Sequence, residues 1–174
     1  MDAPGQPVVV ITGASSGIGR ETARLFAARG AAAARERFGR VDVWVNNAAV
    51  SGYGELNTLP IKAIDRILDV DLRGQVYGVK AVLPILREQG HGTIIGVSSG
   101  VGVRSVPLMI PYCIAKSGVN ALYEGLRLEE RHAKSGVRVT MILPASVDTP
   151  FYDSATSWMG VRPAPIPPAV GAMK

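Results

Sequence analysis

A glycine-rich loop near the start of the chain limits the possible folds more than any other feature. Residues 12–19 read Thr-Gly-Ala-Ser-Ser-Gly-Ile-Gly and follow the β-branched run Val8–Ile11. In such a loop Gly13 allows a sharp turn, Gly17 lets the backbone approach a pyrophosphate, and Gly19 lets a helix pack close to the strand. The N–H groups and dipole of the helix start favour phosphate. The loop therefore predicts a strand–turn–helix unit that binds a dinucleotide, although a glycine turn without a ligand is the alternative for this motif alone.

Short apolar runs alternate with longer amphipathic segments along the chain. The predicted strands are Pro7–Ile11, Val41–Val45, Thr93–Val97 and Val137–Leu143. The predicted helices are Ile18–Arg29, Ala31–Phe38, Ile61–Gln89 and Cys113–His132. The segment from Ser154 onward shows no clear element. Alternation of strands and helices is typical of a parallel sheet with helices on both faces. We therefore predict a single α/β domain over residues 1–174, with a Rossmann-type doubly wound sheet in three α/β/α layers.

The junction between Gly30 and Ala31 does not fit such a domain. Gly30 is a plausible helix stop, but a run of alanines, a plausible helix body, follows at once. A dinucleotide fold places its second strand here, with a residue that reads the adenosine ribose about twenty residues after the glycines. That distance ends near Gly39–Arg40, with no strand before it. We infer that segments are absent at this point and near the C-terminus, either left out of the ordered chain or deleted.

Composition excludes several classes of protein. A chain of 174 residues with 47% hydrophobic residues suits one globular domain. The net charge is +5, but no run of Lys and Arg would follow a nucleic-acid backbone. No stretch of about eighteen apolar residues predicts a membrane span, and the first residues do not resemble a signal peptide. Cys113 is the only cysteine, so no internal disulfide can form. We expect a cytoplasmic protein with no metal site and no nucleic-acid or membrane partner.

Tyr112, Lys116 and Ser99 form a candidate catalytic group. Tyr112 and Lys116 are four residues apart, so on a helix they share one face. An ammonium beside a phenol lowers the phenol pKa from about 10, which makes Tyr112 a usable acid or base. Ser99 follows the third predicted strand, at the sheet edge where α/β proteins bind ligands. Each residue alone has a simpler explanation: a solvated lysine for the pair and a strand-end cap for Ser99.

These motifs together resemble the short-chain dehydrogenase/reductase family. The matching segments, which lie in the family's order between Val8 and Tyr152, are TGASSGIG at 12–19, NNAA at 46–49, Ser99 placed thirteen residues before Tyr112, YCIAK at 112–116 and PASVDT at 144–149.

The resemblance implies a role for each matching residue. Tyr112 would be the acid/base, Lys116 would lower its pKa and hold the nicotinamide ribose, and Ser99 would position the carbonyl oxygen. The implied cofactor-binding residues are Gly13, Ser15, Ser16, Gly17, Ile18, Gly19, Asn47, Ala48, Ala49, Tyr112, Lys116, Pro144, Val147 and Thr149. Two departures from the family pattern, Ala49 and Ala145 in place of glycines, are mild.

A third departure concerns a fourth catalytic position. The family has an asparagine in an NxxG-like stretch of the long helix, and its main-chain carbonyl holds a water in a proton relay to the lysine. The matching stretch here starts with Asp71. Asp71 keeps the carbonyl, so the relay could persist, but a buried carboxylate needs a partner or a proton. We include Asp71 in the site, with a helix-kink position of no catalytic role as the alternative.

The resemblance implies an NAD(P)-dependent oxidoreductase that interconverts a secondary alcohol and a ketone. A catalytically weak, dinucleotide-binding regulatory protein is the alternative, but such proteins usually lose the tyrosine or the lysine. Ser15 and Ser16 would tolerate a 2′-phosphate, which slightly favours NADP over NAD. Apolar side chains before and after the site suggest an apolar substrate, unless they pack as core or interface; they are Leu108, Met109, Phe151, Tyr152, Trp158 and Met159.

The long predicted helix over Ile61–Gln89 suggests self-association. Its apolar residues occupy more than one side, and they include Ile64, Ile67, Val70, Tyr77 and Val82. One face can cover the sheet and leave another free to pair. Family members commonly form dimers and tetramers through this helix and the one that follows Tyr112. We therefore expect a homodimer or homotetramer.

Overall fold

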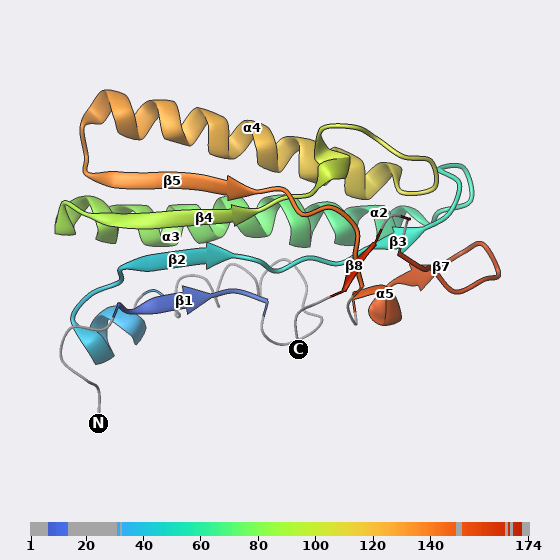
Figure 1. Ribbon diagram of the computed structural model, residues 1–174, viewed down its shortest axis with the longest axis horizontal. Coiled ribbons are helices and arrows are strands. Elements are labelled where there is room, and N and C mark those ends of the chain that lie inside the picture. Colours follow the sequence, from blue (N-terminus) through green and yellow to red (C-terminus); the bar gives the residue numbers. More distant parts are fainter. Residues whose placement is uncertain are drawn as a thin grey trace.

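The four central strands of the computed structural model form one parallel sheet. They are β1 (Val9–Ile11), β2 (Val43–Asn46), β4 (Gly92–Val97) and β5 (Val137–Ile142). Their order in the sheet is β1-β2-β4-β5, and each neighbouring pair runs parallel. The structure describes residues 7–13, 31, 33–148, 151–165, 167 and 169–171. The parallel α/β architecture predicted from the sequence is confirmed (Figure 1).

Two long helices cover one face of this sheet. They are α3 (Gly74–Gln89) and α4 (Ile110–Ala133). Alternate residues of β4 are buried, which is the pattern of a strand that presents one face to these helices. A salt bridge from Arg87 to the buried carboxylate of Glu130 joins the two helices. The predicted helix Ile18–Arg29, which would belong to the second helical layer, lies outside the described residues.

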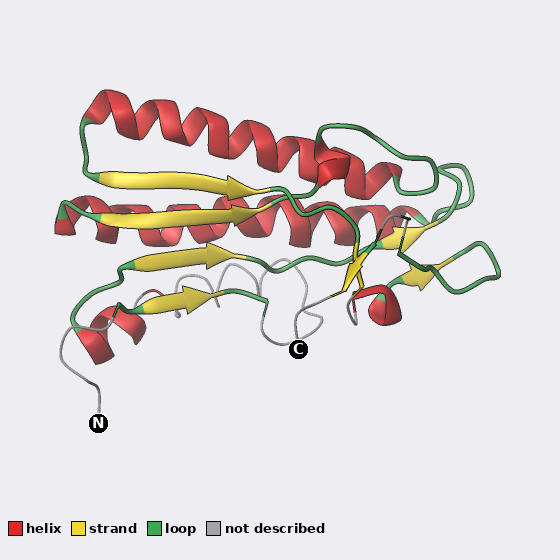
Figure 2. Ribbon diagram, in the orientation of Figure 1, coloured by secondary structure: helices red, strands yellow, loops and turns green. Residues whose placement is uncertain are grey.

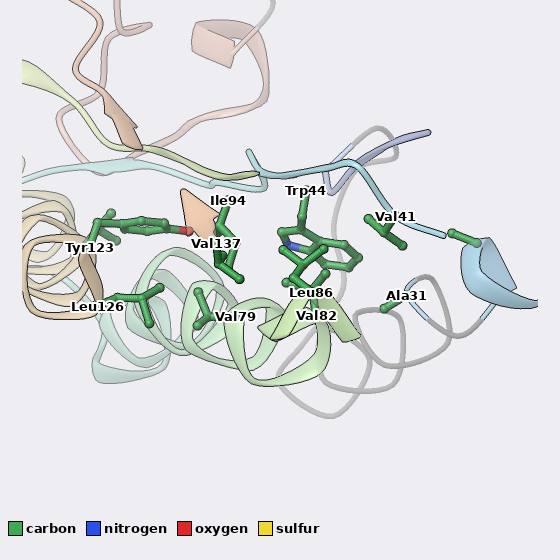
Figure 3. Close-up of a cluster of buried hydrophobic side chains, with 12 residues drawn as sticks. Ala31, Val41, Trp44, Val79, Val82, Leu86, Ile94, Tyr123, Leu126 and Val137 are labelled. Atoms are coloured by element: carbon green, nitrogen blue, oxygen red, sulfur yellow. The ribbon is translucent and has the colours of Figure 1, made fainter. Parts of the chain in front are cut away.

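The core lies between the sheet and these helices. Trp44 and Ile94 point from the strands toward Val82 and Leu86 of α3, as Figure 3 shows, and all four are fully buried. Tyr123 of α4 packs against the same cluster. The short helical stretch over residues 33–38, predicted from the sequence, contributes Ala34. The core is therefore built from the apolar stripes that the sequence showed.

The segment predicted as one helix over Ile61–Gln89 is helical throughout but not uniform. It consists of α2 (Ile61–Leu68), a π-helical turn η1 (Asp69–Arg73) and α3. Within it Ile67, Val70 and Val82 are buried in this chain. These three residues therefore belong to the face that packs inside this chain, and not to a face that is free for self-association.

The remaining elements are short. A 3₁₀ turn, η2 (Gly100–Gly102), follows β4. β3 (Gly52–Tyr53) pairs with β7 (Thr156–Ser157), and β6 (Val147–Asp148) pairs with β8 (Val170–Gly171). A single turn of helix, α5 (Phe151–Ser154), lies between β6 and β7 (Figure 2). α4 begins three residues earlier than predicted, because Pro111 is tolerated in a first helical turn. Within the described residues, every helix is too short or too polar to span a lipid bilayer.

Candidate active site

The candidate site residues gather where the parallel strands end. Because parallel strands have their carboxyl ends at the same edge, the segments that follow β1, β2, β4 and β5 meet there (Figure 1). Thr12 and Gly13 follow β1, Asn47 follows β2, and Ser99 follows β4. The first turns of α4 bring Tyr112 and Lys116 to this edge.

Tyr112 and Ser99 form the hydroxyl pair of the candidate site. Their side chains are close enough for Ser99 to lower the pKa of Tyr112, and Tyr112 is 8% exposed. The Ser99 hydroxyl also accepts a hydrogen bond from the N–H of Val101, at 3.4 Å, at the start of η2. The strand-end cap and the catalytic role considered for Ser99 are therefore compatible. The pair places two hydroxyl groups at the carboxyl end of the sheet.

Lys116 is fully buried and lies against the ring of Tyr112. Its Nζ donates a hydrogen bond to the carbonyl of Val97 at 3.1 Å. The same nitrogen lies 5.3 Å from the centre of the Tyr112 ring and 4.0 Å from Oδ2 of Asp71. An ammonium has three N–H donors. Among the described residues only the Val97 carbonyl accepts one of them, so Lys116 keeps donors for a bound hydroxyl group.

The pKa of Tyr112 shifts in the opposite direction to the one expected from the sequence. Burial raises it above the ordinary value of 10, and the negative charge of Asp71 raises it further. The interaction with Ser99 lowers the pKa of Tyr112 but is a smaller effect. Burial also lowers the pKa of Lys116, although Asp71 opposes that shift. Spacing alone shows neither the burial of the phenol nor the carboxylate next to the lysine, and these two features raise the pKa of Tyr112.

Asp71 lies in the π-helical turn η1 and is fully buried. Its Oδ1 accepts a hydrogen bond from the N–H of Val50 at 2.8 Å. Its Oδ2 has no hydrogen-bond partner among the described residues. Burial raises the pKa of Asp71 to about 7, while Lys116 and the Val50 N–H act against that rise. The structure therefore brings Asp71 together with Lys116 and Tyr112, as the sequence analysis expected.

The described part of the predicted cofactor region is closely packed. Gly13 has φ +80°, and a Cβ there would lie 2.4 Å from Cα of Ala48, so only glycine fits. Oγ1 of Thr12 accepts hydrogen bonds from the N–H groups of Asn47, at 3.1 Å, and Ala48, at 3.4 Å. These contacts hold the segment after β2 against the turn after β1. The predicted residues Ser15, Ser16, Gly17, Ile18, Gly19 and Thr149 lie outside the described residues.

The other predicted cofactor residues follow β2 and β5. Ala49 is half-buried after Ala48. The carbonyl of Pro144 accepts a hydrogen bond from Gly100 at 3.0 Å, and Val147 starts β6. The tight turn at Gly13 and the buried ammonium of Lys116 fit a nicotinamide dinucleotide, which needs close backbone approach and a donor for its ribose. No group of His, Cys, Asp or Glu that could hold a metal occurs within the described ranges.

Apolar side chains surround Tyr112 on its other side. Met109 and Cys113 are buried beside it, and Phe151 lies with its ring centre 5.9 Å from that of Tyr112. Tyr152 and Met159 pack on the same cluster. Trp158 instead lies over β3, where a Cβ on Gly52 would lie 3.0 Å from its ring, so Trp158 fits the packing alternative considered for it. Leu108 is 36% exposed and has the left-handed φ of +65°.

Sequence reasoning missed a buried polar network behind the site. Asn46 donates to the hydroxyl of Tyr123 at 2.7 Å and to the carbonyl of Gln75 at 3.1 Å. Nε2 of Gln75 donates to the Val97 carbonyl at 3.2 Å, the same carbonyl that accepts from Lys116. Asn46 begins the NNAA motif and Gln75 occupies a core position of an amphipathic helix, but neither feature alone indicated that the two are joined. Tyr53, which packs with Tyr112, was also missed because it belongs to none of the motifs.

Comparison with known proteins identifies the relatives of this chain. The sequence model of the short chain dehydrogenase family matches residues 31–160. The oxidoreductase YxnA of Bacillus subtilis is 33% identical over 201 residues, covering 90% of this chain and 56% of YxnA. The 2-(R)-hydroxypropyl-CoM dehydrogenase of Xanthobacter autotrophicus is 34% identical over 130 residues, covering 73% of this chain and 50% of that enzyme.

A solved structure agrees with these matches. The crystal structure of levodione reductase superposes with a TM-score of 0.71 at 29% identity, covering 78% of this chain and 52% of that protein. The chain thus spans about half the length of several relatives it matches. The family match starts at Ala31, the residue that follows the junction noted in the sequence.

Proposed function

The chain belongs to the short-chain dehydrogenase/reductase family, and on this basis we propose that it transfers hydride between a nicotinamide dinucleotide and a secondary alcohol or ketone. The pair of Tyr112 and Ser99, with the buried Nζ of Lys116 5.3 Å from the centre of the Tyr112 ring, carries this proposal. Its relatives are dehydrogenases and reductases at about 30% identity. The proposed dinucleotide is NAD or NADP, with a slight preference for NADP from the two serines of the glycine loop.

The roles of the three side chains follow from charge. A bound nicotinamide would supply or accept the hydride. Reduction of a ketone leaves growing negative charge on its oxygen, and that charge needs a hydrogen bond and then a proton. Tyr112 donates the proton, and Ser99 donates the hydrogen bond. Lys116 favours the phenolate by its charge and has N–H donors for a ribose. The apolar cluster around Tyr112 supports an apolar substrate.

The test is replacement of Tyr112 by phenylalanine. Tyr112→Phe keeps the ring and removes the proton, so ketone-dependent oxidation of NADH or NADPH should fall about a hundredfold or more. Dinucleotide binding, measured by calorimetry, should persist. Tyr77→Phe, on α3 away from the site, is the matched control and should keep full activity. Near-normal reduction by Tyr112→Phe would disprove the mechanism and favour a regulatory dinucleotide-binding protein.

A second variant tests the lysine through pH. Alcohol oxidation should rise with pH as the phenol of Tyr112 loses its proton. Because the charge of Lys116 favours the phenolate, Lys116→Met should move that rise to higher pH and also weaken dinucleotide binding. A rise at the same pH in both proteins would show that Lys116 does not act on Tyr112.

A further inference from the structure

Two opposite charges lie buried together below Tyr112. Asp71 comes from the π-helical turn η1 and Lys116 from α4, and their side chains are 0% and 1% exposed. Oδ2 of Asp71 and Nζ of Lys116 are 4.0 Å apart, which is too far for a hydrogen bond. The two groups therefore interact through charge without being locked to each other. Such a pair can change its protonation state without breaking a hydrogen bond between its members.

The partners of this pair are few. Oδ1 of Asp71 is held by the Val50 N–H, whereas Oδ2 has no hydrogen-bond partner among the described residues. From α4, Lys116 and Tyr112 are the titratable groups that interact with Asp71. The other charges of η1 pair with each other, because Arg73 and Asp69 form a salt bridge and Arg73 is half-exposed. Tyr53 and Tyr152, which pack in the same apolar cluster as Tyr112, also interact with it.

We propose that the side chain of Asp71 is a positioning residue that sets the charge felt by Tyr112: when ionised, it offsets the charge of Lys116 and keeps the phenol protonated. The proposal rests on the function proposed above and adds a role for the carboxylate, separate from any role of the main-chain carbonyl. It gives a role to a buried carboxylate whose Oδ2 faces the Lys116 ammonium and has no hydrogen-bond partner among the described residues.

The direction of the effect follows from the sign of each charge. An ionised Asp71 opposes formation of a second negative charge on Tyr112, so the phenol remains a proton donor to higher pH. Ketone reduction needs this protonated form. Alcohol oxidation needs the phenolate and is therefore displaced to more alkaline pH. Because the pKa of Asp71 is about 7, its charge is gained as pH rises through neutrality.

The experiment is an NMR titration of the full-length protein, labelled with ¹³C at aspartate and lysine side chains. In the unaltered protein we expect the Asp71 carboxyl to titrate close to pH 7, far above the ordinary value of about 4. In Asp71→Asn, which keeps an oxygen to accept from Val50, the Lys116 midpoint should fall by about one pH unit or more. Asp69→Asn, in the same turn, is the matched control and should change neither titration.

A kinetic measurement completes the test. With Asp71→Asn the rise of alcohol oxidation should move to lower pH, and with Asp69→Asn it should not move. An Asp71 carboxyl that titrates near its ordinary value, or a Lys116 midpoint unchanged in Asp71→Asn, overturns the proposal. Absence of ketone reduction in every variant would instead refute the proposed function. The NMR titration would still decide the role of Asp71, because it needs no turnover.

Discussion

The contact between Gly96 of β4 and Tyr123 of α4 gives a quantitative test of the fold. A Cβ at position 96 would lie 2.3 to 2.7 Å from three atoms of the Tyr123 ring, closer than real contacts allow. The ring cannot move aside easily, because it is fully buried and its hydroxyl is bonded to Asn46. Gly96 does not have a positive φ, so alanine there meets a steric obstacle but no backbone strain. We expect Gly96→Ala to destabilise the protein.

The magnitude follows from the overlap. Adding a methyl group to a well-packed core costs about 1–3 kcal/mol. The value here should reach the upper end, about 3 kcal/mol, because the obstacle is a rigid ring. For a domain of this size about 1 kcal/mol shifts the melting temperature by roughly 2–4 °C, so a fall on the order of 6–12 °C is expected. Urea unfolding followed by circular dichroism measures the change in free energy.

Two backgrounds isolate the ring as the cause. Tyr123→Phe keeps the buried ring but removes its bond to Asn46, so Gly96→Ala should remain destabilising there, at somewhat less cost than in the unaltered protein. Tyr123→Leu removes the ring, so the same substitution should cost less by about 1 kcal/mol or more, within the range typical of contacting pairs. An equal cost of Gly96→Ala in the Tyr123→Leu variant and in the unaltered protein would show that the two residues are not in contact, and the packing of α4 on β4 would be wrong.

Three further predictions concern regions that the sequence analysis singled out. Gly17→Val should place a side chain where the pyrophosphate binds and abolish dinucleotide binding; unchanged affinity by calorimetry would contradict the glycine-loop assignment. The protein should form a symmetric homo-oligomer, and light scattering at micromolar concentration checks this. Ile114 and Leu128 on α4 are 51% and 59% exposed, so their replacement by serine tests whether this helix forms the interface. If the natural protein carries further residues between Gly30 and Ala31, its intact mass should exceed 18.3 kDa. A mass of 18.3 kDa would instead point to a deletion.

The sequence predicted the regular elements because their signals are local. The runs Val137–Leu143 and Thr93–Val97 match β5 and β4 to within one residue, and periodicity found the helical span of Ile61–Gln89. Periodicity did not show the π-helical turn inside that span, because five residues are too few to change its phase visibly. The two-residue strands β3, β6, β7 and β8 were missed for a related reason: they exist only through pairing between distant segments.

The sequence predicted which residues form the candidate site better than it predicted the electrostatics of that site. Ser99, Tyr112, Lys116 and Asp71 were named from motif positions, and the structure brings them together. The upward shift of the Tyr112 pKa could not be predicted, because it depends on burial and on the Asp71 charge, and both arise from tertiary packing. The network through Asn46 and Gln75 was missed because polar residues in a core have no local pattern.

The Val97 carbonyl has a consequence for attempts to engineer this protein. It accepts one hydrogen bond from Gln75 of the buried polar network and one from Lys116 of the candidate site, so it links the two groups of residues. The buried side-chain oxygen of Gln75 has no partner among the described residues, which makes Gln75→Leu an obvious stabilising design. That substitution would remove one of the two donors to the Val97 carbonyl and allow the Lys116 side chain to take a different position. Selection for heat resistance at position 75 should therefore trade against turnover, and libraries that vary it need to be screened for both.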